Sequence, residues 1–156
     1  MIYVHTDGSA RFNPGDGGWA AIVVRDDLVT EIGGFVANTT NNRMEMLSAI
    51  KALETIGDGE SVTAHSDSAY LVNGIKSWID NWQKNNWKTS NRGEVLNKDL
   101  WLELLVHKAR LKIEWKKVKG HADDKWNNRC DEIATTFSAK KPIVLYSGSL
   151  VSYVIP

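Results

Sequence analysis

Short runs of hydrophobic, β-prone residues separated by turn formers fill the first forty positions of the chain. The runs cover residues 2–6, 19–24 and 28–36, and residues 13–18 between the first two are dense in Pro, Gly and Asp. Runs of this length that end in Gly and Pro are typical of strands joined by tight connections. The pattern predicts three consecutive strands forming an antiparallel meander.

The spacing of apolar residues becomes helical after position 40. Apolar residues every three or four positions predict an amphipathic helix over Asn42–Ile56, ended by Gly57-Asp58-Gly59. The rest of the pattern predicts, in order, a strand at 61–66, a helical stretch after Asp67 through Trp82, an exposed connection at 84–97, a helix around 100–105, a strand at 111–118 and a helix at 126–137. This order predicts an α/β (mixed α+β) fold with a five-stranded mixed sheet flanked by helices.

The last residues have no clear place in this scheme. The tail, residues 141–156, begins with Lys141-Pro142 and is apolar and β-prone from Ile143 onward. An added edge strand, an ordered arm and disorder are all open for this tail. Residues 1–140 have the length of one domain and show no internal repeat or linker.

The composition is that of a globular protein, and the charge is unevenly placed. The 42% hydrophobic and 24% charged residues exclude a disordered chain or a fibre, and 19 basic residues balance 19 acidic ones. Residues 1–83 contain 5 basic and 11 acidic residues, whereas residues 84–120 contain 10 and 4. The neutral total is therefore a cancellation, and the basic stretch is available to a polyanionic partner.

Cysteine and signal content favour a cytoplasmic protein. Cys130 is the only cysteine and cannot form an internal disulfide, and the four histidines have no zinc-ligand spacing. No secretory signal is visible at the N-terminus, and no apolar stretch approaches the ~18 residues that span a bilayer. We expect a cytoplasmic location and no membrane partner.

Four carboxylates stand at the ends of predicted elements. Asp7 and Asp67 each close a strand, Glu45 lies in the first turn of a helix, and Asp131 lies in the last helix. If the strands of Asp7 and Asp67 are neighbours, their carboxylates meet at one edge of the sheet. A cluster of carboxylates without Cys or His suits Mg²⁺ or Mn²⁺.

Each carboxylate also has a purely structural interpretation. Asn42-Arg43-Met44-Glu45 has the spacing of a capping box, in which Glu45 would bind a backbone N–H. Asp67 would cap the next helix, Asp7 would begin a turn, and Asp131 would lie on a solvated helix face. Spacing alone does not decide between these interpretations.

The sequences around the carboxylates resemble a known family. The motifs are Thr6-Asp7-Gly8-Ser9, Asn13-Pro14-Gly15, Thr40-Asn41-Asn42-Arg43-Met44-Glu45, Ser66-Asp67-Ser68, Val118-Lys119-Gly120-His121-Ala122 and Asn127-x-x-Cys130-Asp131-Glu132. Their order and spacing over residues 1–137 resemble type 1 ribonuclease H in its bacterial form. The resemblance implies a ribonuclease H-like sheet, residues 1–140 as the catalytic domain, and a monomer.

The resemblance also implies the chemistry. The family hydrolyses the RNA strand of RNA–DNA hybrids and leaves 5′-phosphate and 3′-hydroxyl ends. Asp7, Glu45, Asp67 and Asp131 would be catalytic and metal-binding, with Asp7 bridging two Mg²⁺ ions, and Mn²⁺ as a possible substitute. His121 matches the auxiliary histidine of the family.

Substrate contacts are likewise implied by resemblance. Asn13 and Asn41 would contact 2′-hydroxyls, Thr40 and Arg43 would contact DNA phosphate, and Trp78 would touch the DNA strand. Lys84 and Lys88 belong to a basic protrusion that would grip the duplex backbone. Ala69 stands where bacterial members commonly carry Gln, and the protrusion carries less charge than usual, so we expect weak, salt-sensitive binding. The tryptophans also have a purely structural interpretation, in which they pack in the hydrophobic core.

Two other functions compete with a hybrid-specific ribonuclease. A nuclease or strand-transfer domain acting on DNA shares such carboxylate clusters by fold analogy. A non-catalytic hybrid-binding module would need a defect outside the four carboxylates. Cleavage assays on hybrid and duplex DNA distinguish the three.

Overall fold

The structure of the chain, a computed structural model, describes residues 1–120 and 123–155. Its strands are β1 (Ile2–Ala10), β2 (Gly15–Arg25), β3 (Leu28–Thr39), β4 (Ser61–Ser66), β5 (Lys112–Lys117) and β6 (Ser147–Ser149). Its helices are α1 (Asn41–Glu54), α2 (Ala69–Asn73), the π-helical turn η1 (Gly74–Trp78), α3 (Ile79–Lys84), α4 (Lys98–Arg110) and α5 (Lys125–Ser138). The predicted mixed α/β fold is confirmed.

One mixed sheet organises the molecule, in the order β5-β4-β1-β2-β3-β6. The pairs β1–β2, β2–β3 and β3–β6 are antiparallel, whereas β1–β4 and β4–β5 are parallel. The predicted N-terminal meander is present, but the sheet has six described strands instead of the five predicted. The added strand, β6, comes from the tail, so the edge-strand alternative is correct for Ser147–Ser149, and the other described tail residues form an arm.

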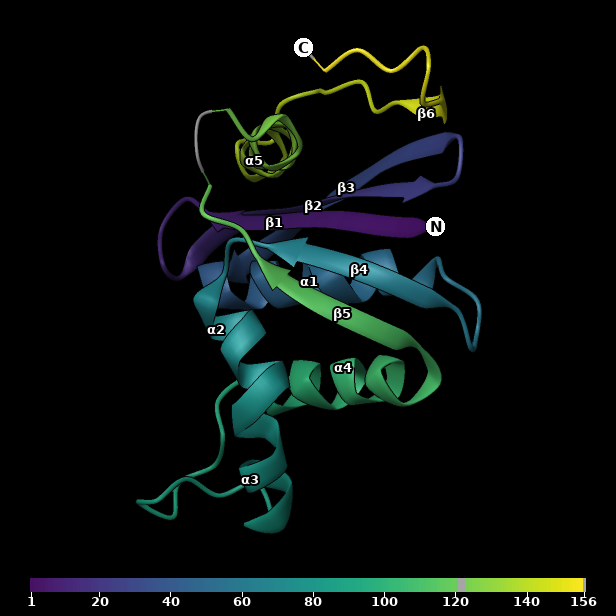
Figure 1. Cartoon of the computed structure of the whole chain (residues 1–156). Helices are drawn as coiled ribbons and strands as arrows, with labels where there is room; N and C mark the ends of the chain where they lie inside the picture. The colour runs from purple at the N-terminus through teal and green to yellow at the C-terminus, as the bar shows by residue number, and fades with distance from the viewer. Residues whose placement is uncertain (121–122, 156) are drawn as a thin grey trace.

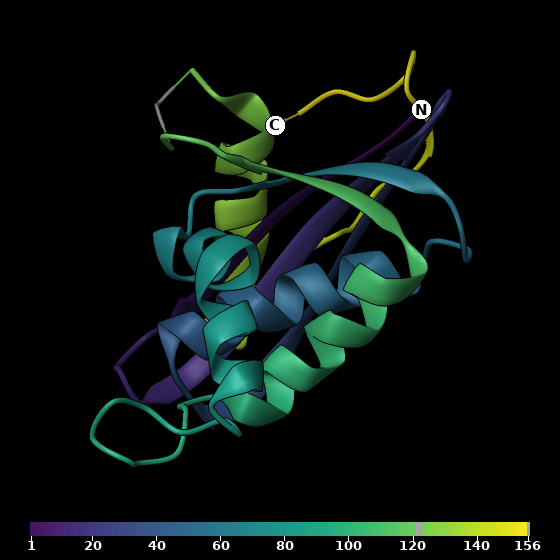
Figure 2. The ribbon, with the colours of Figure 1, turned by 60° about the horizontal axis from the view of Figure 1, so that its bottom comes forward.

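Helices cover both faces of the sheet (Figure 1). One face packs against α1 and α4, which Figure 2 shows side by side beneath the sheet, and the larger hydrophobic cluster lies there around Ile50, Leu53 and Trp101. The other face carries α5 and the tail over a smaller cluster around Ile22, Val29 and Ile133. Burial of these apolar side chains is the main stabilising term.

The N-terminal caps of α1 and α2 correct two interpretations of the carboxylates. Thr40 caps α1, with its hydroxyl oxygen accepting from the Arg43 N–H at 3.2 Å, so the capping box that would have used Glu45 is wrong. Ser68 caps α2 in the same way, accepting from the Leu71 N–H at 3.1 Å, so Asp67 is not the cap. Neither the Glu45 nor the Asp67 carboxylate therefore caps a helix.

The predicted helical stretch after Asp67 contains α2, η1 and α3 in sequence, and a loop follows that projects from the body of the molecule (Figures 1 and 2). Trp101 is fully buried, and Trp82 lies against it with ring centroids 5.3 Å apart. Trp78 remains 38% exposed. Core packing thus accounts for Trp101, whereas Trp78 presents a face to solvent.

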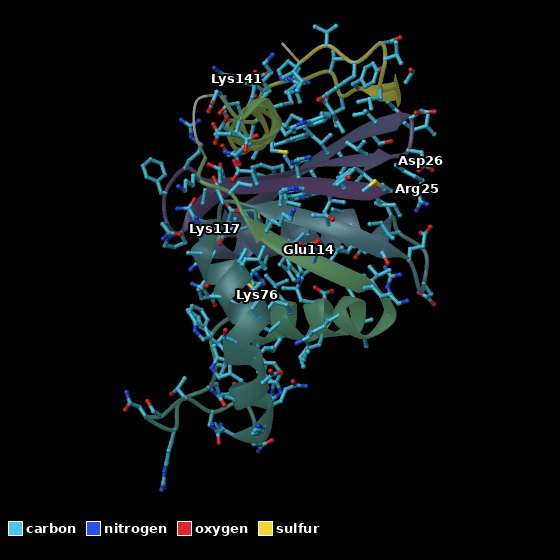
Figure 3. All side chains as sticks on the ribbon, viewed as in Figure 1. Arg25, Asp26, Lys76, Glu114, Lys117 and Lys141 are labelled. Carbon is cyan, nitrogen blue, oxygen red and sulfur yellow. The ribbon has the colours of Figure 1, made fainter. Side chains whose placement is uncertain are left out.

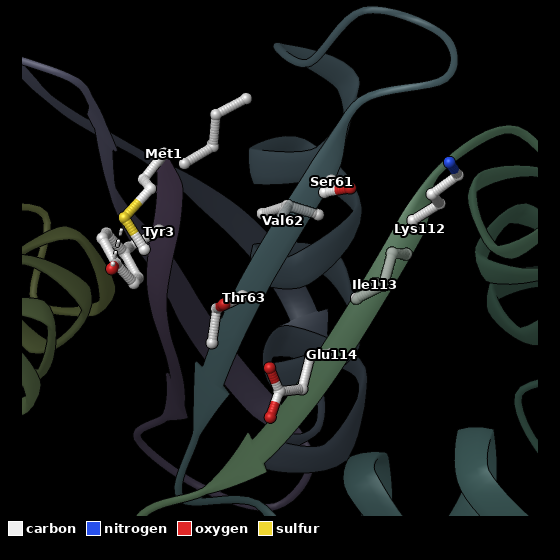
Figure 4. A pocket seen from close by; sticks show the side chains of 9 residues that line it. Met1, Tyr3, Ser61, Val62, Thr63, Lys112, Ile113 and Glu114 are labelled. Atoms are coloured by element: carbon white, nitrogen blue, oxygen red, sulfur yellow. Dashed lines mark hydrogen bonds between the residues drawn. The ribbon is translucent and has the colours of Figure 1, made fainter.

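A shallow cavity of about 450 Å³ lies over β4 and β5, where neither α5 nor the tail covers the sheet (Figure 4). Its lining includes Tyr3, Thr63 and Ile113 and none of the four predicted carboxylates. No helix in the described part of the chain has the length and apolar content needed to cross a membrane.

Candidate active site

Parallel pairing of β1 with β4 brings the first two carboxylates together. Thr6 is the register partner of Ser66, so Asp7 and Asp67 follow paired residues at the same edge of the sheet. Glu45 enters from the second turn of α1. One carboxylate oxygen from each of Asp7, Glu45 and Asp67 lies within 4.8 Å of the other two. The convergence expected at a strand end beside a helix start is therefore present.

The approach of α1 to β1 depends on Gly8. A Cβ built there would lie 2.2 Å from the carbonyl carbon of Met44 and 2.3 Å from the backbone nitrogen of Glu45. No side chain fits at those distances, so only glycine lets the helix backbone come this close to the strand. The Gly8 N–H also donates to Asp7 Oδ1 at 2.9 Å and fixes that carboxylate.

Burial makes the negative charges of Asp7 and Glu45 costly. Asp7 is 4% exposed and Glu45 9%. Burial raises the pKa of Asp7 to about 7, and the charges of Asp67 and Asp131 add to the effect. Burial, followed by the charge of the neighbouring Asp7, raises the pKa of Glu45 well above its usual range. The cluster thus favours binding of positive charge, whether protons or cations.

Asp67 is shared between the sheet and α5. Burial raises the pKa of Asp67, while a hydrogen bond from the Asn127 side chain and the charge of Lys117, at the end of β5 in Figure 3, oppose that rise. Asp131 lies one turn after Asn127 on α5 and is exposed. It lies outside the 4.8 Å cluster, but its charge raises the pKa of both Asp7 and Asp67.

The cluster fits a divalent cation. Glu45 Oε2 is buried and has no hydrogen-bond partner. A buried, unpaired carboxylate oxygen costs free energy unless a cation or donor meets it. Three hard oxygen donors of high pKa, with no Cys or His among them, suit Mg²⁺ or Mn²⁺ better than zinc.

Residues expected to read the 2′-hydroxyls lie where the β1–β2 connection meets the start of α1. Asn41 Oδ1 accepts from the Ala10 N–H at 2.7 Å, and Asn13 Oδ1 accepts from the Asn41 N–H at 3.0 Å. These bonds tie the β1–β2 connection to the helix through the oxygen atoms of the two side-chain amides. Thr40, the α1 cap, is their neighbour. The structure therefore brings Asn13, Thr40 and Asn41 together.

Arg43 is linked to Trp78 through a chain of polar and aromatic contacts. Its guanidinium donates to both carboxylate oxygens of Asp99 and, at 3.2 Å, to Asn97 Oδ1. Asn97 Nδ2 donates to the Tyr70 hydroxyl at 3.0 Å, and the Tyr70 ring meets Trp78 edge-on with centroids 5.8 Å apart. Arg43 and Trp78 therefore lie on one connected surface.

The predicted basic residues lie at the base of the projecting loop and within it. Lys84 is the last residue of α3, and in the described part of the chain no ion pair engages it. Lys88 pairs with Glu94 at 3.5 Å, with both side chains exposed. His121, the predicted auxiliary histidine, lies outside the described residues.

Several residues that contact the candidate site or support it were not identified from the sequence. Asn127 belongs to the Asn127-x-x-Cys130-Asp131 motif, and its i, i+4 spacing to Asp131 was the signal that could have identified it. Asp99 and Asn97, the partners of Arg43, carry no such signal because they lie on an element far along the chain. The same holds for Glu31 and Arg129, which form a buried ion pair between β3 and α5.

Comparison with known proteins agrees with this geometry. The RNase H family model matches residues 1–139. The chain is 50% identical over 135 residues to a ribonuclease H of Acetivibrio thermocellus, covering 86% of this chain and 92% of that one. It is 46% identical over 142 residues to a ribonuclease H of Chlorobium luteolum, covering 90% and 97%.

Solved structures show the same fold. LC9-RNase H1, described as a type 1 RNase H with the type 2 active-site motif, matches with a TM-score of 0.81 at 27% identity, over 96% of this chain and 78% of that one. LC11-RNase H1, solved in complex with an RNA/DNA hybrid, matches with a TM-score of 0.63 at 23% identity, over 90% of this chain and 98% of that one. Because the RNase H family model matches residues 1–139 and a curated ribonuclease H is 50% identical over 135 residues, the chain belongs to the RNase H family.

Proposed function

We propose that this ribonuclease H cleaves the RNA strand of RNA–DNA hybrids by two-metal-ion hydrolysis and leaves 5′-phosphate and 3′-hydroxyl ends. The observation that carries the proposal is the cluster of Asp7, Glu45 and Asp67 in a chain of this family, with an unpaired buried oxygen on Glu45. LC11-RNase H1, which shares the fold, was solved in complex with an RNA/DNA hybrid.

Asp7, Glu45 and Asp67 would hold divalent cations, with Asp131 as a further ligand from α5. When bound, such cations supply an activated water, neutralise charge on the scissile phosphate and stabilise the leaving oxygen. The chain itself orients the ligands. The Gly8 N–H fixes Asp7, and the Asn127 side chain holds Asp67. Mg²⁺ is the proposed ion and Mn²⁺ its substitute.

Discrimination of the RNA strand would come from Asn13 and Asn41. Their oxygens accept backbone hydrogen bonds, so their NH₂ groups are the parts left to donate to a 2′-hydroxyl. The 2′-hydroxyl is the group that separates RNA from DNA at each position. Hydrogen bonds that fix these two side chains would give the discrimination its geometry.

The DNA strand would cross the connected surface from Arg43 to Trp78, with Lys84 and Lys88 on its phosphates. Phosphate contacts of this kind give affinity without sequence preference and weaken with salt. Because Glu94 pairs with Lys88, Lys84 would carry more of the phosphate attraction. The Lys88–Glu94 pair supports the prediction of weak, salt-sensitive binding.

His121 remains proposed as a proton shuttle or an aid to product release, since the unperturbed histidine pKa lies near neutrality. Replacement by Ala should slow turnover and leave activity measurable. A single-turnover rate and a steady-state rate, measured together, separate the two roles, because only product release is absent from the former. The monomer and the cytoplasmic location also remain predictions.

A cleavage assay tests the proposed function. Labelled RNA–DNA hybrid, RNA–RNA and DNA–DNA duplexes are each incubated with the protein and Mg²⁺, Mn²⁺ or chelator. We expect cleavage of the RNA in the hybrid alone, and only with a cation. Products should accept a 5′ label only after phosphatase treatment. Preferential cleavage of duplex DNA, or hybrid binding without turnover, would support the competing functions instead.

A further inference from the structure

The tail lies beyond the residues that match the family, yet it is packed against the body of the protein. It leaves α5, reaches the outer edge of the sheet where β6 pairs with β3, and returns toward α5 (Figure 1). Ile143, Leu145, Tyr146 and Tyr153 join the hydrophobic cluster beneath α5. The tail therefore contacts the helix that carries Asn127 and Asp131.

The tail makes hydrogen bonds to a buried ion pair between β3 and α5. Glu31 on β3 and Arg129 on α5 have side-chain exposures of 1% and 6%, and Arg129 donates to both Glu31 oxygens at 2.7 and 2.9 Å. The tail supplies two more donors to this carboxylate, the Tyr146 N–H at 2.9 Å and the Tyr153 hydroxyl at 2.6 Å. The Val144 carbonyl accepts from Arg129 at 3.1 Å. Buried charges need such full pairing.

Tyr153 also begins an aromatic stack that crosses α5 to the sheet. Its ring lies on Trp126 at 5.6 Å with an interplanar angle of 17°. Trp126 in turn stacks on His5 of β1 at 4.8 Å and 6°. The indole is thus enclosed between a tail residue and the strand that carries Asp7.

Trp126, which stacks on Tyr153, and Arg129, which shares Glu31 with Tyr153, lie on either side of the residue that contacts Asp67. Trp126 and Arg129 are one turn apart on α5, and Asn127, which binds Asp67, lies between them. Asp131 follows Arg129 by two positions. Tyr153 therefore contacts the first turns of α5 in two ways, directly through Trp126 and indirectly through Glu31, which binds Arg129.

We propose that Tyr153 is a positioning residue that holds Asn127 and Asp131 against the carboxylate cluster and so sets the affinity of the site for divalent cations. The proposal rests on the proposed function for its assignment of Asp131 as a ligand. Tyr153 touches none of the cluster residues and acts through α5.

The test compares the variants Tyr153→Ala and Tyr153→Phe with a matched control, Val151→Ala. Val151 belongs to the same tail and is 92% exposed. Mg²⁺ binding is measured by calorimetry without substrate, and amide hydrogen exchange is measured across residues 125–131. We expect Tyr153→Ala to weaken Mg²⁺ binding about 5-fold and to raise exchange at these amides, within the range of a lost aromatic pair. Tyr153→Phe keeps the ring and should weaken binding about 2-fold, and Val151→Ala should change neither.

A purely structural role predicts something different. The thermal midpoint of Tyr153→Ala would fall, but the folded protein would bind Mg²⁺ as the wild type does, and that result would overturn the proposal. If Tyr153→Ala does not fold, Tyr153→Phe decides alone by the same two measurements. Wild-type protein that neither binds Mg²⁺ nor cleaves hybrid overturns the proposed function instead. Exchange rates at α5 then still decide whether Tyr153 positions the helix.

Discussion

Arg43 on α1 and Asp99 on α4 form a two-point ion pair, with Nη1 2.9 Å from Oδ1 and Nη2 2.7 Å from Oδ2. This pair occupies Nη1 and Nη2, two donors that the guanidinium would otherwise offer to a phosphate. A hybrid that uses Arg43 must therefore compete with Asp99. The competition gives a physical reason for modest affinity.

Asp99→Asn should tighten hybrid binding. The amide preserves the shape of the side chain but removes the charge that engages Arg43, so we expect the Kd to fall about 3-fold at low salt and the salt dependence to steepen by roughly one phosphate contact. Fluorescence anisotropy over a salt series measures both. Glu54→Gln is the control, because it also removes one negative charge. Glu54 lies on α1 in an exposed ion pair with Lys51. Weaker binding by Asp99→Asn would instead show that Asp99 orients Arg43 for the substrate.

Asp7→Asn should abolish cleavage while preserving hybrid binding. Losing this ligand removes several kcal/mol of transition-state stabilisation, so we expect a fall on the order of 10³-fold or more in kcat. The metal-free variant should also be more stable by about 1–2 kcal/mol, because a buried, repelling carboxylate has become neutral. Urea unfolding with and without Mg²⁺ measures the second effect. Wild-type turnover at saturating Mg²⁺ would exclude Asp7 from catalysis.

Glu31→Gln should lower stability most at neutral pH. Burial alone would raise the pKa of Glu31, but hydrogen bonds from Arg129, Tyr153 and the Tyr146 N–H outweigh it and hold that pKa below 4.5. A depressed carboxylate pKa contributes stability that is fully present above the unfolded value of 4.5 and is lost as pH falls through the folded value. Removing one partner of a buried pair costs about 3–5 kcal/mol.

The difference in free energy of unfolding between wild type and Glu31→Gln should therefore become smaller as pH drops below 4.5. Urea unfolding at pH 7, 5, 4 and 3 measures it. Glu60→Gln serves as the control, since Glu60 pairs with Arg25 at an exposed site, where the pair contributes little. If this difference in free energy of unfolding stays constant from pH 7 to pH 3, Glu31 does not stabilise the protein through its ion pair.

Lys84→Ala should weaken hybrid binding more than Lys88→Ala. Lys88 already pairs with Glu94, whereas Lys84 has no such partner within the described chain. Loss of one phosphate contact reduces the salt slope by about one unit and affects all sequences alike. Lys112→Ala, on the edge strand β5, is the control. Equal effects of all three substitutions would indicate general electrostatic attraction rather than a protrusion that grips the duplex.

Local patterns predicted most of the first 138 residues. β4 has the expected bounds, and α1 and α5 differ from expectation by only one or two residues, because their apolar spacing matches the faces they bury. The first three strands are longer than predicted. β1 continues through Ser9 and Ala10 because these residues pair with Gly18 and Gly17, and such pairing does not show in hydrophobicity.

The rest depended on contacts between distant segments. β6 is Ser-Gly-Ser, without a hydrophobic signal, and it is anchored because Tyr146 and Tyr153 reach Glu31 across 115 and 122 positions. Three of the four carboxylates converge as predicted from strand and helix ends. The pairing of Arg43 with Asp99 required the docking of α4 on α1, which no local pattern encodes.

Gly8 gives the site a vulnerability that an inventory of its ligands does not reveal. The single methyl group of Gly8→Ala would collide with the backbone of α1 at Met44 and Glu45, and the helix would have to retreat. Asp7, Glu45 and Asp67 would all still be present, yet the distances between them would no longer suit one cation. A variant of this enzyme can therefore retain every acidic residue and be inactive, and tolerance of substitution at position 8 reports on the spacing of the carboxylates.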